Sequence, residues 1–297
     1  MEARIPVLDL HMHTTVSDGT DTPEEILAHV KDAGIGLFSV TDHDAVEGCR
    51  RIFAIRTEND PAFITGIEFS CKDEEGQYHI LGYGYDPDAE AINAIVRLGH
   101  GYRMQKLQKR LAFIRERFGF VFSGEEVDAL LRLNNPGKPH IANLMVLHGY
   151  AKDRNEAIRT YLNQAHFAEE YVRPEDAING ILLSGGIPVL AHPPFGNGDQ
   201  LILGSALEAR VQKLIGFGLS GLEAFYSGFT EKLRNDVLAL AGKYGLYVTA
   251  GSDFHGSNKL IPLGDTGLSG TTEIPVGLTA FIQKIEERRK SNENRRH

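Results

Sequence analysis

The amino-acid sequence predicts an α/β fold in which about seven strand–helix units form a barrel that is interrupted by a helical insertion. Short apolar segments alternate with amphipathic helices up to residue 85, and the alternation resumes after Pro174. Such alternation is typical of parallel strands joined by right-handed crossovers. Between the two parts, residues 88–162 show only helical periodicity, so we expect no strand there. The number of units favours a closed barrel over an open sheet.

The first part of the barrel contains four predicted strands and two predicted helices. The helix after the first strand begins with Thr22 and Glu25 at the spacing of a capping box, has Pro23 at its first position and ends at Gly34. A second helix runs through Ile55, and the turn DEEGQ separates the third strand from the fourth. The predicted strands occupy residues 5–10, 36–40, 62–70 and 78–85.

The second part contains three further strands and four helices, the last of which is amphipathic and precedes the polar tail SNENRRH. The predicted strands occupy residues 187–192, 221–227 and 246–256, and the predicted helices occupy residues 174–183, 206–218, 230–244 and 276–290. We therefore expect a barrel domain that consists of residues 1–85 and 175–297, with a helical insertion over residues 86–174.

Composition and charge exclude several classes of protein. Hydrophobic residues make up 42% of the 297 residues, no apolar stretch could span a membrane, and the start MEARIP lacks the apolar region of a signal peptide. Cys49 and Cys71 form no C-x-x-C pair, which argues against a disulfide framework and a thiolate zinc site, so we expect a cytoplasmic protein. A net charge of −9 argues against a general nucleic-acid binder.

Histidines and carboxylates gather at the ends of the predicted strands. His11 and His13, in DLHMHT, are two residues apart and therefore point to the same face of the first strand. An isolated His-x-His pair is more often half-buried polar structure than a metal site. Here, residues of the same kinds lie at or beside the other strand ends: Asp18, His43, Glu68, His79, His192, Asp253 and His255. Because the carboxyl ends of barrel strands converge on one face, we expect these side chains to meet.

These motifs resemble a known family. DLHMHT, SDG, TDHD, GIEFS, YHILGYG, AHP and GSDFHG are similar to the motifs of the PHP (polymerase and histidinol phosphatase) superfamily of metal-dependent phosphoesterases, over residues 5–85 and 185–256. Within it the chain looks most like the small stand-alone enzymes. The resemblance implies a distorted (β/α)7 barrel and three divalent ions. His11, His13, Glu68 and Asp253 would hold one ion, with Glu68 bridging to a second. The second ion would also be held by His79 and His192, and the third by Asp18, His43 and His255.

The residue types agree with these ligand sets. Imidazole and carboxylate without thiolate suit Mn, Zn or Fe and do not distinguish among them. Glu68 and Asp253 would be catalytic through the ions that they hold. Asp42 would orient a ligating imidazole, whereas Asp44 is expected to cap the following helix. Three divalent ions would also supply the positive charge that an acidic protein needs in order to bind phosphate.

Substrate contacts are expected from the insertion, which would form part of the substrate pocket. The turn NNPGKPHIAN presents Lys138 and His140, and His140 is the one candidate for a general acid. The family often has R-P-H-I-A here, so Lys138 replaces a bidentate fork with a point charge. Arg103 is a weaker candidate, because a helix this basic is usually a solvated face. Tyr226 is expected to be no more than a wall of the pocket.

The sequence therefore predicts a trinuclear-metal phosphoesterase that hydrolyses a small phosphorylated metabolite by attack of a metal-held hydroxide on phosphorus. Nucleotide-like monoesters, or cyclic phosphodiesters followed by the monoester, are the favoured substrates. A histidinol-phosphate phosphatase is the alternative, followed by a metal-dependent amidohydrolase that cleaves C–N bonds and by a non-catalytic domain of the kind found in replicative polymerases. We expect no membrane partner and no long nucleic acid, and the oligomeric state is left open.

Overall fold

The computed structural model describes residues 7–198, 200–268 and 274–293. Ile5 and Pro6 of the predicted first strand, and the last residues of the polar tail, lie outside this range. Within it, no helix is both long and apolar enough to cross a membrane.

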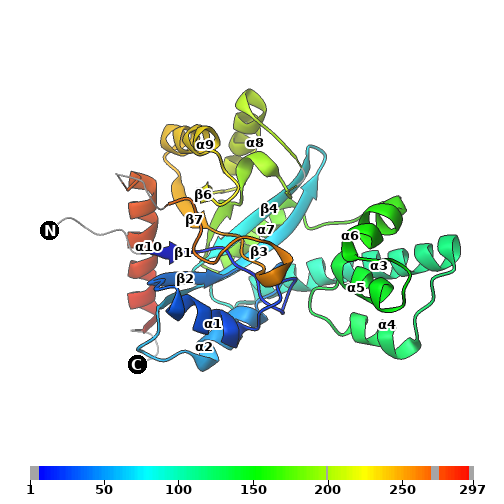
Figure 1. The fold of residues 1–297 in the computed structure, drawn as a ribbon. Helices are drawn as coiled ribbons and strands as arrows, with labels where there is room; N and C mark the ends of the chain where they lie inside the picture. Colours follow the sequence, from blue (N-terminus) through cyan, green and yellow to red (C-terminus); the bar gives the residue numbers. More distant parts are fainter. Residues whose placement is uncertain (1–6, 199, 269–273, 294–297) are drawn as a thin grey trace.

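Seven strands in the order of the sequence form a nearly closed barrel (Figure 1). The first and last strands meet where the Leu10 N–H donates to the Ala250 carbonyl at 3.0 Å, and Met12 forms an isolated bridge with Phe254. The predicted α/β barrel is confirmed. The strands are β1 (Leu8–Asp9), β2 (Leu37–Val40), β3 (Ala62–Asp73), β4 (Gly76–Tyr83), β5 (Ile187–Leu190), β6 (Gly221–Tyr226) and β7 (Tyr247–Gly251).

The expectation of a uniformly parallel barrel is wrong for β4. This strand runs antiparallel to both of its neighbours, and it pairs His79 with Ser70 of β3. The cause is the connection between β3 and β4, which consists of Glu74 and Glu75 and is far too short for a crossover. The reversal brings the start of β4 to the carboxyl end of β3, where the other strand ends lie.

Helices surround the barrel on its outer face (Figure 1). The first of them has the predicted capping box, in which the Glu25 N–H donates to Thr22 Oγ1 at 3.2 Å and the Thr22 N–H donates to Glu25 Oε2 at 2.7 Å. Short 3-10 turns span Pro193–Phe195 and Gly256–Asn258. The helices of the barrel are α1 (Pro23–Asp32), α2 (Glu47–Ile55), α7 (Pro174–Leu183), α8 (Gly204–Gly216), α9 (Glu231–Tyr244) and α10 (Val276–Glu293).

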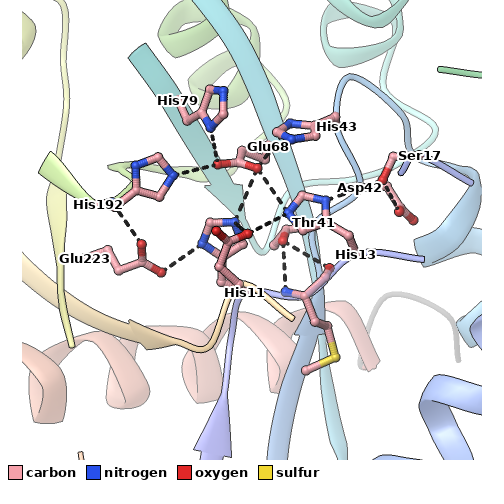
Figure 2. Close-up of polar contacts among 12 residues, drawn as sticks. His11, His13, Ser17, Thr41, Asp42, His43, Glu68, His79, His192 and Glu223 are labelled. Atoms are coloured by element: carbon pink, nitrogen blue, oxygen red, sulfur yellow. Dashed lines mark hydrogen bonds and ion pairs between the residues drawn. The ribbon is translucent and has the colours of Figure 1, made fainter. Parts of the chain in front are cut away.

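The alternation of side chains at the end of β1 is visible in the packing. Met12 is fully buried in an apolar cluster with Phe38 and with residues of α1 and α2. His11 and His13 point to the other face, as two residues on either side of Met12 must do in an extended chain (Figure 2). Burial of Met12 therefore fixes the direction in which both imidazoles point.

The segment between β4 and α7 is helical. It consists of α3 (Glu90–Phe118), α4 (Gly124–Leu131), α5 (Lys138–Leu147) and α6 (Arg154–Glu156), followed by single turns at Ala157–Tyr161 and Leu162–Gln164. These helices gather on the side of the barrel opposite α10 (Figure 1). They enclose an apolar cluster of their own, which includes Leu107, Ile114, Ile141 and Met145. The start of α3 packs closely on the barrel helix α7, where Ile95 lies against Gly180.

Candidate metal centre

Glu68 lies at the centre of the histidine cluster. It stands on β3, is 1% exposed, and its two carboxylate oxygens lie among five imidazoles (Figure 2). The separations between these oxygens and the nearest ring nitrogens range from 2.9 to 3.4 Å. Oε2 faces His11, His13 and His43, and Oε1 faces His79 and His192. One carboxylate thus touches ligands from both halves of the barrel.

Two aspartates complete the cluster. Asp253 Oδ1 lies 3.4 Å from His13 Nε2 and 3.4 Å from His255 Nδ1. Asp18 Oδ1 lies 3.3 Å from His255 Nε2. The structure therefore places together all nine side chains that the sequence analysis proposes as ligands: His11, His13, Asp18, His43, Glu68, His79, His192, Asp253 and His255.

Close approach of β1 and β7 positions the ligands at the two ends of the chain. The Asp253 N–H donates to the His11 carbonyl at 2.8 Å. A side chain at Gly251 would not fit, because its Cβ would lie 2.2 Å from His11 Cβ. Two of the candidate ligands have backbones in the left-handed region, His192 at φ 27° and Asp253 at φ 58°. Such backbones cost about 1–3 kcal/mol each and are common at functional sites.

The chemistry of the cluster fits metal ions. Buried polar atoms nearly always have hydrogen-bond partners, and one that lacks a partner costs roughly 1–3 kcal/mol. Several atoms turned into the cluster have no hydrogen-bond partner among the residues that the structure describes; they are Nε2 of His11 and His13, Nδ1 of His43 and His79, Oδ1 of Asp18 and both oxygens of Glu68. A cation would satisfy all of them at once.

In the described part of the chain, three groups of side-chain atoms are compact enough to hold an ion, with all atoms of a group within 4.8 Å of one another. They are His13 with Asp18, His43 and His255; His11 with His13 and Asp253; and His43 with Glu68 and His79. These groups overlap at His13 and His43, whereas the family resemblance gives each of these histidines to one ion. Which ligands share an ion thus remains a prediction.

Electrostatics keeps the carboxylates of the cluster ionised. Burial alone would raise the pKa of Glu68, but the nearby imidazoles of His79, His11 and His43 hold it well below its usual range. The pKa of Asp253 is likewise held low against the effect of burial, mainly by His11 and Lys259. The cluster therefore offers fixed negative charge to a cation.

Glu223 is a functional residue that the sequence analysis missed. It lies on β6, is 0% exposed, and accepts the His11 Nδ1–H at 2.9 Å through Oε1. Its Oε2 accepts the backbone N–H of His192 at 2.9 Å (Figure 2). This contact turns Nε2 of His11 towards Glu68, so that Nε2 is the atom that would meet a cation. The available signal was a lone glutamate inside the apolar strand segment GLEAFY.

Asp42 acts on the cluster through a hydroxyl group. Its carboxylate accepts hydrogen bonds from the Thr14 N–H at 2.8 Å and from Ser17 Oγ at 2.7 Å. Ser17 Oγ in turn lies 3.4 Å from His13 Nδ1. Asp42 therefore supports the orientation of His13 indirectly, by holding Ser17 and the loop after β1 (Figure 2).

Two expectations about neighbouring residues are wrong. Asp44 does not cap α2, which begins at Glu47 without a side-chain cap; instead its carboxylate accepts the Ser70 N–H at 3.0 Å and Arg103 Nε–H at 2.6 Å. Asp44 lies two residues before the residue that precedes α2, too early to reach its first N–H groups. Tyr226 is more than a pocket wall, since its hydroxyl donates to Asp253 Oδ2 at 3.0 Å.

A cavity of about 690 Å³ separates the cluster from the helical insertion, and Asp18, His43 and His79 line its barrel side. The three substrate-binding candidates line it too. Lys138 Nζ donates to Asn163 Oδ1 at 2.8 Å, and His140 Nδ1 accepts the Gly137 N–H at 3.1 Å. Arg103 donates to Asp44 and, at 2.7 Å, to Ser70 Oγ. Their contact with a substrate remains a prediction.

The interpretation of α3 as a solvated basic helix is wrong for one of its faces. Lys106 and Arg110 are each only 7% exposed and line the same cavity as Arg103. Residues at i, i+3 and i+7 share one face of a helix, so this grouping was available from the sequence. What the sequence could not show is that this face meets the cavity and not solvent.

The barrel and its buried cluster of imidazoles and carboxylates define a metal-dependent hydrolase. The model of the PHP domain matches residues 9–170, so the chain belongs to the PHP family. It is a metal-dependent phosphoesterase of that family.

Curated relatives span almost the whole chain. A 3′,5′-nucleoside bisphosphate phosphatase from Chromobacterium violaceum is 27% identical over 95% of this chain and 97% of its own length. A phosphoribosyl 1,2-cyclic phosphate 1,2-diphosphodiesterase from Eggerthella lenta is 29% identical, over 86% of this chain and 96% of its own. The 5′-3′ exoribonuclease Rnm of Escherichia coli is 28% identical, over 87% of this chain and 88% of its own.

Solved structures show the same fold. A protein from Bifidobacterium adolescentis, assigned as a metal-dependent phosphoesterase, superimposes with a TM-score of 0.80 at 24% identity, over 95% of this chain and 96% of its own. The superposition covers the helical segment as well as the barrel, because so little of either chain is left out.

Proposed function

We propose that this enzyme hydrolyses small phosphate esters at a cluster of three divalent ions, Mn, Zn or Fe. The favoured substrates are nucleotide-like monoesters, or cyclic phosphodiesters followed by the resulting monoester. The observation that carries the proposal is the carboxylate of Glu68 among five imidazoles, with buried polar atoms that have no hydrogen-bond partner in the described part of the chain. Bound ions would stabilise charge on a phosphoryl group and supply the nucleophile.

The residues of the chain would divide the remaining tasks. Glu68 and Asp253, held ionised, would hold the cations, and Glu223 would keep His11 and the His192 backbone in place. Because His140 Nδ1 accepts the Gly137 N–H, its neutral ring carries the proton on Nε2, which can donate to a substrate oxygen. Lys138 would contribute positive charge from the opposite wall.

The relatives support this substrate class without choosing within it. Two of them are named for a nucleoside bisphosphate and a cyclic phosphate, both of which are small. Another is named an exoribonuclease. We propose that this chain acts on small esters and not on long nucleic acid, because its net charge of −9 offers no general attraction for a polyanion.

The test combines metal analysis with a phosphate-release screen. Purified protein is reconstituted separately with Mn, Zn and Fe, and bound ions are counted by elemental analysis. The panel contains nucleoside monophosphates and bisphosphates, cyclic phosphodiesters, histidinol phosphate, a 5′-phosphorylated oligoribonucleotide and a dihydroorotate-like amide. We expect about three ions per chain and turnover of several small esters. One ion or fewer would refute the trinuclear cluster. Faster turnover of the oligoribonucleotide, or of the amide alone, would refute the substrate class.

A further inference from the structure

The wall of the cavity formed by α3 carries two cationic side chains, Lys106 and Arg110, with N–H donors that lack acceptors in the described part of the chain. Lys106 is 7% exposed, and its Nζ lies 3.5 Å from the centre of the Tyr171 ring. Among the residues that the structure describes, this ammonium group has no hydrogen-bond or ion-pair partner. Such a group has three N–H donors, and burying them without acceptors is costly. Lys106 also lines the cavity, so an incoming acceptor could reach it.

Arg110 stands one helical turn further along the same face of α3. One end of its guanidinium pairs with Glu169, but its Nε is buried and has no hydrogen-bond partner among the described residues. Arg103 lies on this face as well, but its guanidinium is already held by Asp44 and Ser70. Lys106 and Arg110 therefore retain free donors beside one another, and an anion between them would also relieve the repulsion between like charges.

We propose that Lys106 and Arg110 form a second anion subsite, which holds a second phosphoryl group of the substrate while the first lies at the metal cluster. The inference rests on the proposed function, because the cluster and the subsite line a single cavity. A phosphoryl group fits because it offers several acceptor oxygens and a charge of about −2 to two cations. The substrate would then be an ester with two phosphoryl groups, and a monophosphate would leave the subsite without an anion.

Steady-state kinetics of the Mn-loaded enzyme tests the subsite. The substrates are a nucleoside 3′,5′-bisphosphate, the matching 5′-monophosphate and a 5′-phosphorylated dinucleotide. We expect the wild type to favour the bisphosphate over the monophosphate at least tenfold in kcat/KM. Lys106→Met should lower kcat/KM for the bisphosphate by about 10–100-fold, as loss of a hydrogen bond to a charged group predicts, and change the value for the monophosphate less than about twofold. Lys106→Arg should restore most of the preference.

Arg115→Met is the matched control, because it removes one cation from an exposed position on the same helix. It should leave both substrates unaffected. If the dinucleotide shows the same advantage and the same loss in Lys106→Met, the subsite accepts a phosphodiester and the inference stands. Equal losses on the bisphosphate and the monophosphate would overturn it and leave the proposed function intact.

Two readouts do not depend on turnover. Calorimetric titration of the metal-free protein with the bisphosphate should show binding that Lys106→Met weakens at least tenfold and Arg115→Met does not change. Lys106→Met should also raise Tm by about 2–4 °C, because it removes a buried charge that has no counterion. Unchanged binding of the bisphosphate in Lys106→Met would overturn the inference, whether or not the enzyme hydrolyses phosphate esters. Absence of hydrolysis of every phosphate ester would instead refute the proposed function.

Discussion

The two walls of the cavity are built from different kinds of structure. On the barrel wall, the metal-ligand candidates lie within strands or in the segments that follow them, and hydrogen bonds between the backbones of neighbouring strands hold these segments in place. On the insertion wall, the polar side chains come from α3, α5 and the segment 163–171, and they hold one another through pairs such as Lys138 with Asn163. The helices of the insertion wall pack around an apolar cluster of their own, so their polar side chains can vary without disturbing the residues that the barrel positions.

Removal of Glu68 should disrupt the proposed metal site on the barrel wall and cause the largest loss of activity. Glu68→Ala takes away the carboxylate that faces five imidazoles. We expect kcat/KM for every phosphate ester to fall at least about 10³-fold, beyond the 10–100-fold typical of residues that only support a ligand. Elemental analysis should show fewer ions per chain. Glu74→Ala, at the exposed tip of the same hairpin, is the control, and comparable losses in both variants would contradict the central role of Glu68.

Glu223→Gln should weaken metal binding at the barrel wall without removing a proposed metal ligand. The amide can no longer accept the His11 Nδ1–H as a charged partner, so the imidazole loses its fixed orientation and some of its basicity. We expect metal affinity to fall about 10–100-fold, while kcat at saturating metal changes much less. Activity titrated with Mn after dialysis measures both quantities. A lower kcat at every metal concentration, with unchanged affinity, would show that Glu223 acts on the reaction and not on His11.

Lys138→Ala tests the insertion wall, where we expect binding and not chemistry. If Lys138 meets a phosphate, KM should rise up to about tenfold while kcat stays nearly constant, the pattern of uniform binding. Lys152→Ala, an exposed lysine beyond the end of α5, should change neither. An unchanged KM in Lys138→Ala would show that Lys138 does not bind the substrate and only donates a hydrogen bond to Asn163.

The smallest expected effect is a pH dependence of the bisphosphate preference. Burial, together with the charge of Arg103, lowers the pKa of Lys106 to about 7, with Arg110 opposing protonation and Asp44 and Glu169 favouring it. Below pH 7 the ammonium form dominates and binds an anion, whereas the neutral form takes over as pH rises. The kcat/KM ratio of bisphosphate to monophosphate should therefore fall severalfold from pH 7 to 9, where phosphate monoesters are already dianions. If this kcat/KM ratio does not change with pH in Lys106→Arg, deprotonation of Lys106 is confirmed as the cause. A ratio that does not change with pH in the wild type would contradict the prediction.

The barrel wall could be predicted because its signals are local. The spacing of His11 and His13 determines their common face, and a ligand at the end of a parallel strand must reach the common edge. The reversal of β4 could also have been inferred, since no crossover fits between Asp73 and Gly76. At these positions, residue spacing and loop length are enough to predict the direction of the side chains and of the strand.

The contacts that the sequence did not reveal are those between distant segments. Glu223 lies 212 residues from His11, so nothing near either residue indicates their hydrogen bond. Asp44 looks like a helix cap until Arg103, 59 residues away, is placed beside it. Periodicity showed which residues of α3 share a face, but only the packing of the insertion on the barrel shows what this face meets.

The contact between β1 and β7, which closes the barrel, determines when during protein synthesis the site can form. Seven of the nine proposed ligands lie between residues 11 and 192, but Asp253 and His255 follow the last strand, β7. Because the Asp253 N–H donates to the His11 carbonyl, the cluster is complete only when two segments about 240 residues apart have joined. A ribosome at typical speed needs about ten seconds or more for that stretch. His11 and His13 are therefore synthesised well before Asp253 and His255, and the complete set of proposed metal ligands exists only after the barrel has closed.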